Sequence, residues 1–485
     1  MPDWRLPATA LCLSVLGACS MAPAYQPPAL ATPATYKEQG PWVPAAPGQA
    51  SGPVQQWWTV FGDPVLDGLE GQVETGSPTV AAALGHYDAA RAYLREARSD
   101  ALPHLGLTTD LTRNRQSDDR PLRGSNQPDL YGAYTLGGQV SYDADLWGRV
   151  RDGVAARRAE VQASADDLAA LRISLQSQLA SAYVALRGYD REIGLLETTV
   201  QAYAKADAMT QRRFSDGIAD GVETGQSATQ LAEAQAQLAD LHKARALTEH
   251  AIAGFVGVAA SDFTIAPSTM ELAVASVPAG LPSTLLQRRP DVAAAERRMF
   301  AANRRIGVAK AAFYPALSLS ATGGWQSTAI AGLASAPNVF WSLGPSAVLS
   351  LFDGGRNRAR LAEAKANWTK ATANYRGTVL GAIQEVEDQL ASVHYLADEA
   401  AAENHAAQQA AQVERLSFNR YRKGAADYLD VVTAQAAALR TERASIRLHT
   451  SRLQAMIGLI RAVGGGWSVT PSDAARLQPS SSQPG

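Results

Sequence analysis

The chain has 485 residues, with 44 basic and 46 acidic side chains and a formal net charge of −2. Its charges are scattered and nearly balanced, so the sequence offers no basic surface of the kind that nucleic acid attracts. No apolar run approaches the roughly 18 residues that a membrane-spanning helix requires. Nucleic-acid binding and a helical membrane anchor are therefore excluded.

The first 19 residues have the features of a targeting segment. Arg5 precedes a short apolar run, which Leu16-Gly17-Ala18-Cys19 closes with small residues. This ending resembles a bacterial lipoprotein box, which implies cleavage before Cys19 and acylation of its thiol. A simple signal peptide with an incidental cysteine is the alternative. Cys19 is the only cysteine left after cleavage, which favours lipidation and excludes an intramolecular disulfide.

A strap rich in proline and alanine follows, over residues 19–56. Such a composition favours an extended chain that builds no core of its own. The folded part opens at Trp57. Asp63 followed by Pro64 predicts a helix N-cap with proline in the first turn, and the helix is expected to continue to about Arg98.

Strand periodicity appears once in each half of the chain. From Pro103 apolar residues alternate with polar ones, and a second alternating run follows a polar loop. A similar pair of runs begins after Pro315 and continues to Leu351. Alternation with period two, bounded by turn signals, predicts β-hairpins at about 103–147 and 315–353.

The surroundings of these hairpins allow two interpretations. One is a soluble antiparallel sheet lying on helices, although the remaining sequence leaves little to cover it. The other is the wall of a transmembrane barrel, for which long strands with one apolar face are typical. Because the smallest spanning barrels need about eight strands, four strands per chain would require oligomerisation. A cyclic trimer with twelve strands is the simplest closed solution.

Each hairpin precedes a proline-free stretch of 66 residues, at about 149–214 and 356–421. Apolar residues and alanines recur every 3.5 residues on average, the spacing of a coiled-coil seam. One helix of this length would extend roughly 100 Å. Landmarks such as Gly217 and Gly424 lie 207 residues apart, so the chain is a duplication.

Tight breaks and return helices follow both long stretches. The breaks lie at 215–221 and 423–427, and the return helices at about 222–256 and 429–463. A further helix is expected at 283–312. Heptad spacing and alanine-rich seams predict a wall of closely packed antiparallel helices. The alternative, a solitary rod-like coiled coil, leaves the hairpins unexplained.

Several motifs together resemble the TolC-like outer-membrane efflux protein family, in particular its lipoprotein branch of the NodT and OprM type. The resemblance covers nearly the whole chain from Cys19 to Trp467. It is carried by residues 57–69, Tyr142-Asp143-Ala144-Asp145-Leu146-Trp147-Gly148-Arg149, residues 281–296, Leu351-Phe352-Asp353-Gly354-Gly355-Arg356, Glu385-Val386-Glu387-Asp388, residues 420–424 and residues 464–467.

The resemblance implies an α+β membrane protein with two repeats of long α-helices and one hairpin each. It would form a homotrimeric channel-tunnel, in which a twelve-stranded outer-membrane β-barrel continues into a periplasmic α-helical barrel. The implied divisions are a lipoprotein signal peptide (1–18), a lipid-anchored strap (19–56), two efflux repeats (57–260 and 261–467) and a C-terminal tail (468–485).

The implied function is the outer-membrane channel of a tripartite efflux system. Such a channel is a passive exit duct for small molecules or drugs, delivered by an inner-membrane RND-type pump through a periplasmic adaptor (membrane fusion) protein. The outer-membrane channel of a type I protein secretion system is the alternative. In similar lipoproteins, a residue such as Ser20 after the cysteine fits sorting to the lipid of the outer membrane. The helical barrel would extend into the periplasm.

Two groups of site residues follow from the resemblance. The helix breaks would form tips that dock the adaptor, although simple turn packing would explain the same residues; the tip residues are Phe214, Gly217, Ile218, Tyr421, Gly424 and Ala425. The periplasmic gate would comprise an apolar ring at Leu429, an acidic ring at Asp430 and Thr433, where an aspartate is usual. The alternative is that Asp430 faces outward as an ordinary helix cap.

No motif points to catalysis, a cofactor or a metal ion, so an enzyme is not expected. The sequence has no His-Glu-x-x-His pair, Gly-rich phosphate loop, Gly-x-Ser-x-Gly motif or cysteine cluster. Residues 288–291 could suggest an anion site, but a structural helix cap is the favoured interpretation. A soluble coiled coil and an outer-membrane hydrolase remain as other classes, which solubility of the unlipidated protein or measurable turnover would reveal.

Overall fold

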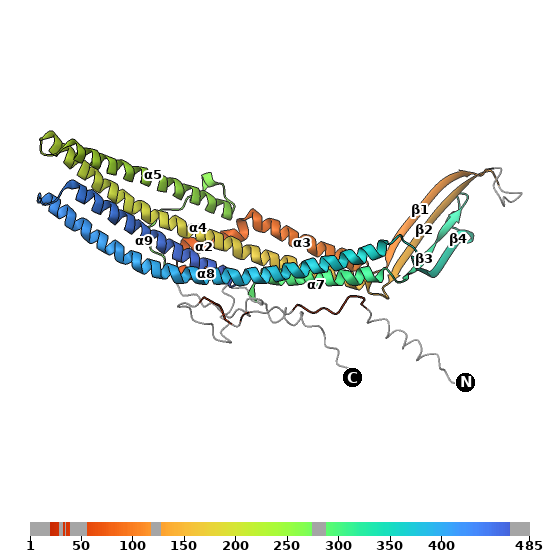
Figure 1. Ribbon diagram of the computed structural model, residues 1–485. Coiled ribbons are helices and arrows are strands. Elements are labelled where there is room, and N and C mark those ends of the chain that lie inside the picture. The colour runs from red at the N-terminus through yellow and green to blue at the C-terminus, as the bar shows by residue number, and fades with distance from the viewer. Residues whose placement is uncertain are drawn as a thin grey trace. The chain divides into compact units, whose positions relative to one another are not determined.

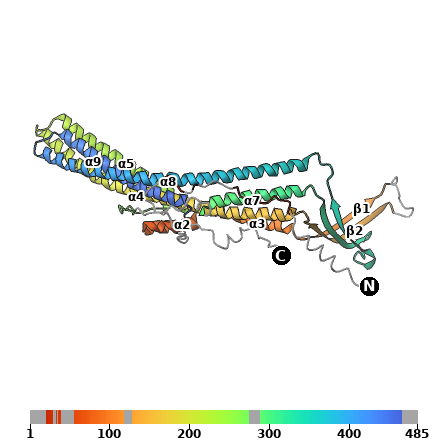
Figure 2. The ribbon, with the colours of Figure 1, turned by 60° about the horizontal axis from the view of Figure 1, so that its bottom comes forward.

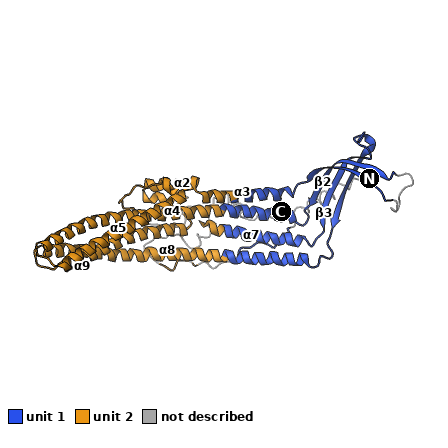
Figure 3. Ribbon diagram, turned by 90° about the horizontal axis from the view of Figure 1, so that it is seen from above, with its two compact units in different colours: residues 1–29, 86–165, 294–375 blue, residues 30–85, 166–293, 376–485 orange. Residues whose placement is uncertain are grey.

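The computed structural model describes residues 20–28, 33, 35–38, 56–117, 128–273 and 288–465. The chain divides into two compact units, coloured separately in Figure 3. Unit 1 comprises residues 1–29, 86–165 and 294–375, and unit 2 comprises residues 30–85, 166–293 and 376–485. Each unit contains segments from both repeats.

The folded part begins with a short 3-10 helix η1 (Trp57–Phe61), followed by α2 (Pro64–Gly76) and α3 (Pro78–Ser99). The N-cap prediction is confirmed, because the Asp63 carboxylate accepts a hydrogen bond of 2.9 Å from the Val65 amide. The prediction of one helix to Arg98 is wrong. Ser77 is extended (φ −69°, ψ 120°), since Pro78 disfavours helical geometry at the residue before it and lacks an amide N–H.

Unit 1 contains a four-stranded antiparallel sheet in the order β1-β2-β3-β4 (Figure 1). Its strands are β1 (His104–Arg115), β2 (Leu130–Ala144), β3 (Ala316–Ser327) and β4 (Val339–Val348). Both predicted hairpins are confirmed, although β4 ends three residues before Leu351. Pairing of Tyr142 with Leu319 joins the hairpins of the two repeats into one sheet, which the sequence had not indicated.

Each hairpin passes into a long helix through an aspartate cap. The Asp145 carboxylate accepts hydrogen bonds from the amides of Val150 and Arg151, at the start of α4 (Arg149–Ser215). Asp353 accepts from the amides of Gly355 and Asn357 at the start of α8 (Arg356–Arg422). The Asn357 amide, as the main cause, holds the pKa of Asp353 below its ordinary value. The two long helices are thus confirmed, with 67 residues each.

Helix α7 (Pro290–Ala311) packs against the first part of α4 in unit 1 (Figure 2). The contact is made by small side chains, Ala156 and Ala159 of α4 and Ala301 of α7, which allow the two helices to approach closely. The predicted start of this helix at Ser283 lies outside the described residues, as do 281–287 of the family motif.

In unit 2 the return helices are α5 (Gly221–Val256) and α9 (Tyr428–Ala462), close to their predicted bounds. Helices α5, α4, α9 and α8 run side by side (Figure 1). The main core forms where one face of α4 meets α2, α5 and α9. That face consists of fully or nearly fully buried side chains, and its largest members are Leu175, Leu179, Tyr183 and Leu186.

A chain of buried polar groups reinforces this core. The Tyr183 hydroxyl donates to the Asp63 carboxylate over 2.5 Å and accepts from Arg187 over 2.9 Å. Arg187 also pairs with Asp190, whose second oxygen binds Arg245 of α5 over 2.6 Å. Burial is the largest cause of the raised pKa of Tyr183. Each charged group in this hydrogen-bonded series, from Asp63 to Arg245, therefore has a partner, which burial of a charge requires.

The described part of the strap contacts the folded body in both units. In unit 1, the Ser20 hydroxyl donates to the buried Asp152 carboxylate over 2.8 Å, and the Tyr25 ring packs edge-on against Phe300. In unit 2, Tyr36 is 9% exposed and packs against Val386 and its neighbours. Composition had indicated only an extended segment. Cys19 lies outside the described residues.

Glu70 of α2 is the one fully buried carboxyl group in the main core that has no partner. It is 1% exposed, and neither oxygen has a hydrogen-bond partner within the described structure. Burial raises its pKa to about 9, from an ordinary value of 4.5. Between these pH values the folded state therefore holds a proton that the unfolded state has released, and stability falls as the pH rises.

We expect Glu70→Gln to stabilise the protein by about 3 kcal/mol at pH 7, because the amide cannot ionise in the unfolded state. The gain should disappear at pH 4. Urea unfolding of the detergent-solubilised protein, followed by its helical circular dichroism at both pH values, checks this. A difference between the variant and the parent protein that is the same at both pH values would show that Glu70 does not carry a raised pKa.

Candidate functional site

The two helix breaks of unit 2 contain the residues that the sequence assigns to docking and gating. Each long helix ends in a glycine with left-handed backbone, Gly217 at φ 71° and Gly424 at φ 70°. The amides that follow bond back to the helix, Ile218 to the Arg213 carbonyl over 2.8 Å and Ala425 to that of Arg420 over 2.9 Å. This is a Schellman-type ending, in which a side chain at the glycine position would cost about 1–2 kcal/mol.

A side-chain contact joins the break of the first repeat to that of the second. Arg213 donates to the Tyr421 hydroxyl over 2.7 Å, and its guanidinium lies 5.1 Å from the centre of the Tyr421 ring. The Tyr421 hydroxyl in turn donates to Glu223 over 3.4 Å. Burial and the Glu223 charge raise the pKa of Tyr421. We call Arg213, Tyr421 and Glu223 the tip tie.

The expected position of Tyr421 on an exposed apolar tip is therefore corrected. Its side chain is 5% exposed in the single chain. Its ring lies 5.4 Å from that of Tyr428 and packs in a small cluster with Val431. The ring is buried because the tip tie and this cluster hold it between α4, α8 and α9.

The other large apolar residues predicted at the tip are exposed. Phe214 is 49% and Ile218 66% exposed in the single chain. Val222, at 64%, belongs with them but was missed by the sequence analysis. The duplication could have indicated Val222, because it is equivalent to the predicted gate residue Leu429, 207 residues later. We call Phe214, Ile218 and Val222 the tip patch.

The predicted gate residues share one exposed face of α9. Leu429 is 57% exposed, and Asp430 and Thr433 are exposed as well. The opposite face, with Tyr428 and Val431, is buried. The Thr433 hydroxyl donates to the Leu429 carbonyl over 2.9 Å, so this donor already has a hydrogen-bond partner within α9. Within the described structure, no side-chain hydrogen bond or ion pair involves the Asp430 carboxylate, so it is free to act on a neighbour.

Further polar contacts join the helix pairs next to the tip. The hydroxyls of Thr210 and Ser227 lie 2.7 Å apart, and Gln230 of α5 donates to Gln435 of α9 over 3.3 Å. The Tyr428 hydroxyl, by contrast, has no partner among the described residues, and burial raises its pKa to about 12. The packing around the breaks therefore combines satisfied and unsatisfied hydroxyl groups.

Two motifs that carried the family resemblance have structural roles. Arg289 is 8% exposed and binds Asp291 and Glu385, each over 2.7 Å, as well as the Ala462 carbonyl. This agrees with a structural cap rather than an anion site. Glu387 accepts the amides of Lys37 and Glu38 from the strap, a role that sequence reasoning did not find.

The described residues contain no group of three His, Cys, Asp or Glu side chains arranged to hold a metal ion. A search of the same residues finds no helix with both the length and the hydropathy needed to cross a membrane. The arrangement around the two breaks combines the charged tip tie with exposed apolar side chains. Its chemistry is that of a contact surface.

Strands that run into pairs of long antiparallel helices define the channel-tunnel class of the TolC type. The sequence profile of the outer membrane efflux protein family matches residues 70–258 and 281–465. The chain belongs to this family. The predicted resemblance is thereby confirmed, and the family is one of channels rather than a class of enzymes.

Individual relatives agree with this assignment. The chain is 32% identical to outer membrane protein OprJ of Pseudomonas aeruginosa over 457 residues, covering 93% of this chain and 94% of OprJ. It is 29% identical to the toluene efflux pump outer membrane protein TtgC of Pseudomonas putida over 454 residues, covering 93% and 94%. The crystal structure of VceC from Vibrio cholerae matches with a TM-score of 0.79 at 28% identity, covering 84% and 98%. The protein is an outer-membrane channel of an efflux system.

We expect Tyr421→Phe to loosen the tip, because it removes the acceptor of Arg213 and the donor to Glu223. Loss of such a charge-assisted bond should speed local amide exchange about tenfold. Hydrogen–deuterium exchange of the intact protein, read at residues 213–223 and 421–428, measures this. The matched control is Tyr428→Phe, whose hydroxyl has no partner. Equal exchange in both variants would show that the tip tie does not hold the breaks together.

Proposed function

We propose that this protein is the passive exit duct of a tripartite pump. In this proposal three copies of the chain, each with the two repeats 57–260 and 261–467, assemble as a homotrimer. An inner-membrane RND-type pump delivers small molecules to it through a periplasmic adaptor. The observation that carries the proposal is the direct passage of β2 into α4 and of β4 into α8. The relative TtgC is a toluene efflux pump outer membrane protein, which supports a small-molecule cargo.

The trimer is proposed from the free edges of the sheet. Within the described residues β1 and β4 each pair on one side only, so each leaves a row of backbone groups without partners. Their side chains include exposed apolar residues, Leu107 at 80% and Trp341 at 78%. Backbone groups in lipid must be paired. Pairing β1 of one copy with β4 of the next, three times around an axis, satisfies them all.

The adaptor is proposed to dock on the tip patch. Phe214, Ile218 and Val222 give a small apolar surface beside a turn, and residues that are exposed, apolar and close together favour protein contacts. Ala425 extends this surface from the second break and is exposed. Gly217 and Gly424 shape the turns, and Tyr421 supports them from beneath.

We expect photocrosslinkers placed at Ala219 and Ala425 to capture the adaptor in cells that express the complete pump. A crosslinker at Tyr395, which is 62% exposed on α8 away from the breaks, is the matched control. Mass spectrometry of the crosslinked products identifies the partner. Capture of the adaptor from the control position alone, or from neither tip position, would contradict docking at the breaks.

The gate is proposed at the exposed face of α9. Threefold symmetry would bring three Leu429 side chains and three Asp430 carboxylates around one axis. Like charges held close together repel one another and attract cations, as charged rings do in pores. The tip tie would then restrain the closed position, because it joins Tyr421 of α8 to the first repeat and the Tyr421 ring packs against Tyr428 at the start of α9.

We expect the purified protein to form narrow, cation-selective pores in planar bilayers. Leu429→Ala should raise single-channel conductance, and Asp430→Ala should reduce cation selectivity and block by divalent ions. The control is Asp216→Ala, an exposed acid at the other break. No pores from the wild-type protein would contradict the channel proposal, whereas pores unaffected by both substitutions would contradict only this gate.

The lipid anchor is proposed at Cys19, with the barrel as a second and independent attachment. The docking of Ser20 on Asp152 supports this, because it holds the first residue after Cys19 against the body. One acyl chain alone gives weak, reversible membrane binding, so a second attachment matters.

We expect Cys19→Ser to abolish acylation, while protein that reaches the outer membrane stays there through its barrel. Mass spectrometry of the mature N-terminus and membrane fractionation measure the two effects. An unmodified Cys19 in the wild-type protein would contradict the lipid anchor.

A further inference from the structure

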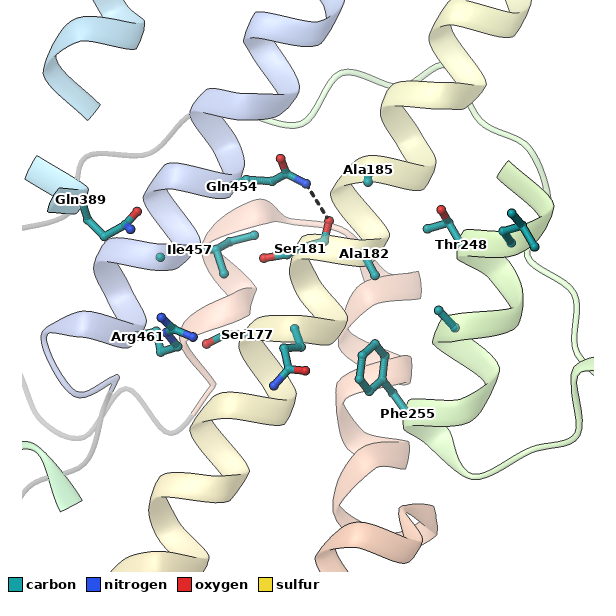
Figure 4. A pocket seen from close by; sticks show the side chains of 14 residues that line it. Ser177, Ser181, Ala182, Ala185, Thr248, Phe255, Gln389, Gln454, Ile457 and Arg461 are labelled. Atoms are coloured by element: carbon teal, nitrogen blue, oxygen red, sulfur yellow. Dashed lines mark hydrogen bonds between the residues drawn. The ribbon is translucent and has the colours of Figure 1, made fainter. Parts of the chain in front are cut away.

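A groove on the helical wall of unit 2 has features that neither the gate nor the docking surface uses. It has a volume of about 620 Å³ and is lined by residues of α4, α5, α8 and α9 (Figure 4). Along α4 its lining residues, such as Ser177 and Ser181, stand two positions from the core residues Leu179 and Tyr183. Two positions turn about 200° around a helix, so the groove lies on the face of α4 opposite the core with α2.

The two sides of the groove differ in polarity. On the α8–α9 side lie the polar residues Gln389, Gln454 and Arg461, beside Ile457 and Gly458. On the α5 side lie the large apolar residues Leu247 and Phe255, beside Thr248 and Ala251. Figure 4 shows α4 between the two, with Gln454 donating to the Ser181 carbonyl over 3.3 Å.

The duplication makes this difference informative. Gln454 stands 207 residues after Leu247, and Arg461 stands 207 residues after Gly254. Equivalent positions of the two repeats thus carry a polar side chain in one and an apolar or absent side chain in the other. The groove is therefore amphipathic across its width.

Two groups in the groove lack partners. Arg461 is exposed, and within the described residues its guanidinium makes no hydrogen bond or ion pair. Ser177 is 4% exposed, and its hydroxyl has no hydrogen-bond partner there either. A buried hydroxyl without a partner costs about 1–3 kcal/mol. A ligand acceptor would satisfy both groups, because a guanidinium donates to acidic oxygens with a fork geometry and a hydroxyl donates to any oxygen.

We propose that this groove is a binding site for amphipathic organic anions that pass through the duct. The acidic group binds Arg461 and Ser177, and the flat apolar body lies on Phe255 and Leu247. This inference rests on the proposed function, since the groove receives solutes only if it faces the lumen of the assembled channel. It assigns a substrate class, a small molecule with one acidic group on an aromatic body.

Binding of 2-naphthalenesulfonate to the intact detergent-solubilised protein, followed by its fluorescence, tests the proposal. Arg461→Gln should weaken binding about tenfold, since one charge-assisted contact is lost. Arg440→Gln removes the same charge from another exposed position of α9 and should leave binding unchanged. The cation 1-naphthylmethylammonium has a similar body and the opposite charge, and it should bind at least tenfold more weakly.

The position of the site is tested separately by labelling Ala251→Cys in the groove with a maleimide. Saturating 2-naphthalenesulfonate should slow labelling several-fold in the Ala251→Cys variant, but not in the double variant Ala251→Cys, Arg461→Gln. Equal binding of the sulfonate by Arg461→Gln and Arg440→Gln overturns the proposal. So does a cysteine that never reacts in the intact assembly, which would show the groove covered by a neighbouring copy. Normal pores in planar bilayers together with either result would leave the proposed duct intact, whereas absent pores would mean that the duct itself has failed.

Discussion

The helical part of this protein depends on one contact surface, the buried face of α4. Leu175, Leu179, Tyr183 and Leu186 are each nearly inaccessible and belong to one core cluster with residues of α2, α5 and α9. A helix of 67 residues is too long for one compact core to contact all of it. Apolar residues must therefore recur along its whole length, and the 3.5-residue spacing keeps them on one face. Truncating one such leucine to alanine would cost about 2–5 kcal/mol.

Buried polar groups fix the register between these packed helices. Tyr183 lies on the same face and passes hydrogen bonds from the Asp63 cap to Arg187, Asp190 and Arg245. An apolar seam alone tolerates sliding between helices. A chain of buried hydrogen bonds does not, because each shift would leave a charged group without its partner. The combination places the breaks of the two repeats at one level within unit 2, where Arg213 reaches Tyr421.

The duplication accounts for the features that the two repeats share, and it identifies the positions where they differ. Aspartate caps at Asp145 and Asp353, 208 residues apart, start the two long helices, and the equivalent glycines Gly217 and Gly424 end them. The two repeats diverge at other positions. Tyr421 is buried while its equivalent Phe214 is exposed, and Arg461 replaces a glycine.

The sequence by itself determined the long helices, the hairpins, the breaks and the family, because these follow from periodicity, capping and turn residues that act over a few positions. It erred at Pro78, whose local effect outweighed the helical pattern around it. Only the tertiary structure decided that Tyr421 is buried, that Glu387 binds the strap and that Ser177 and Arg461 share a groove. These facts depend on which helices become neighbours and on how they are rotated. Residues hundreds of positions apart set that geometry, and no local pattern records it.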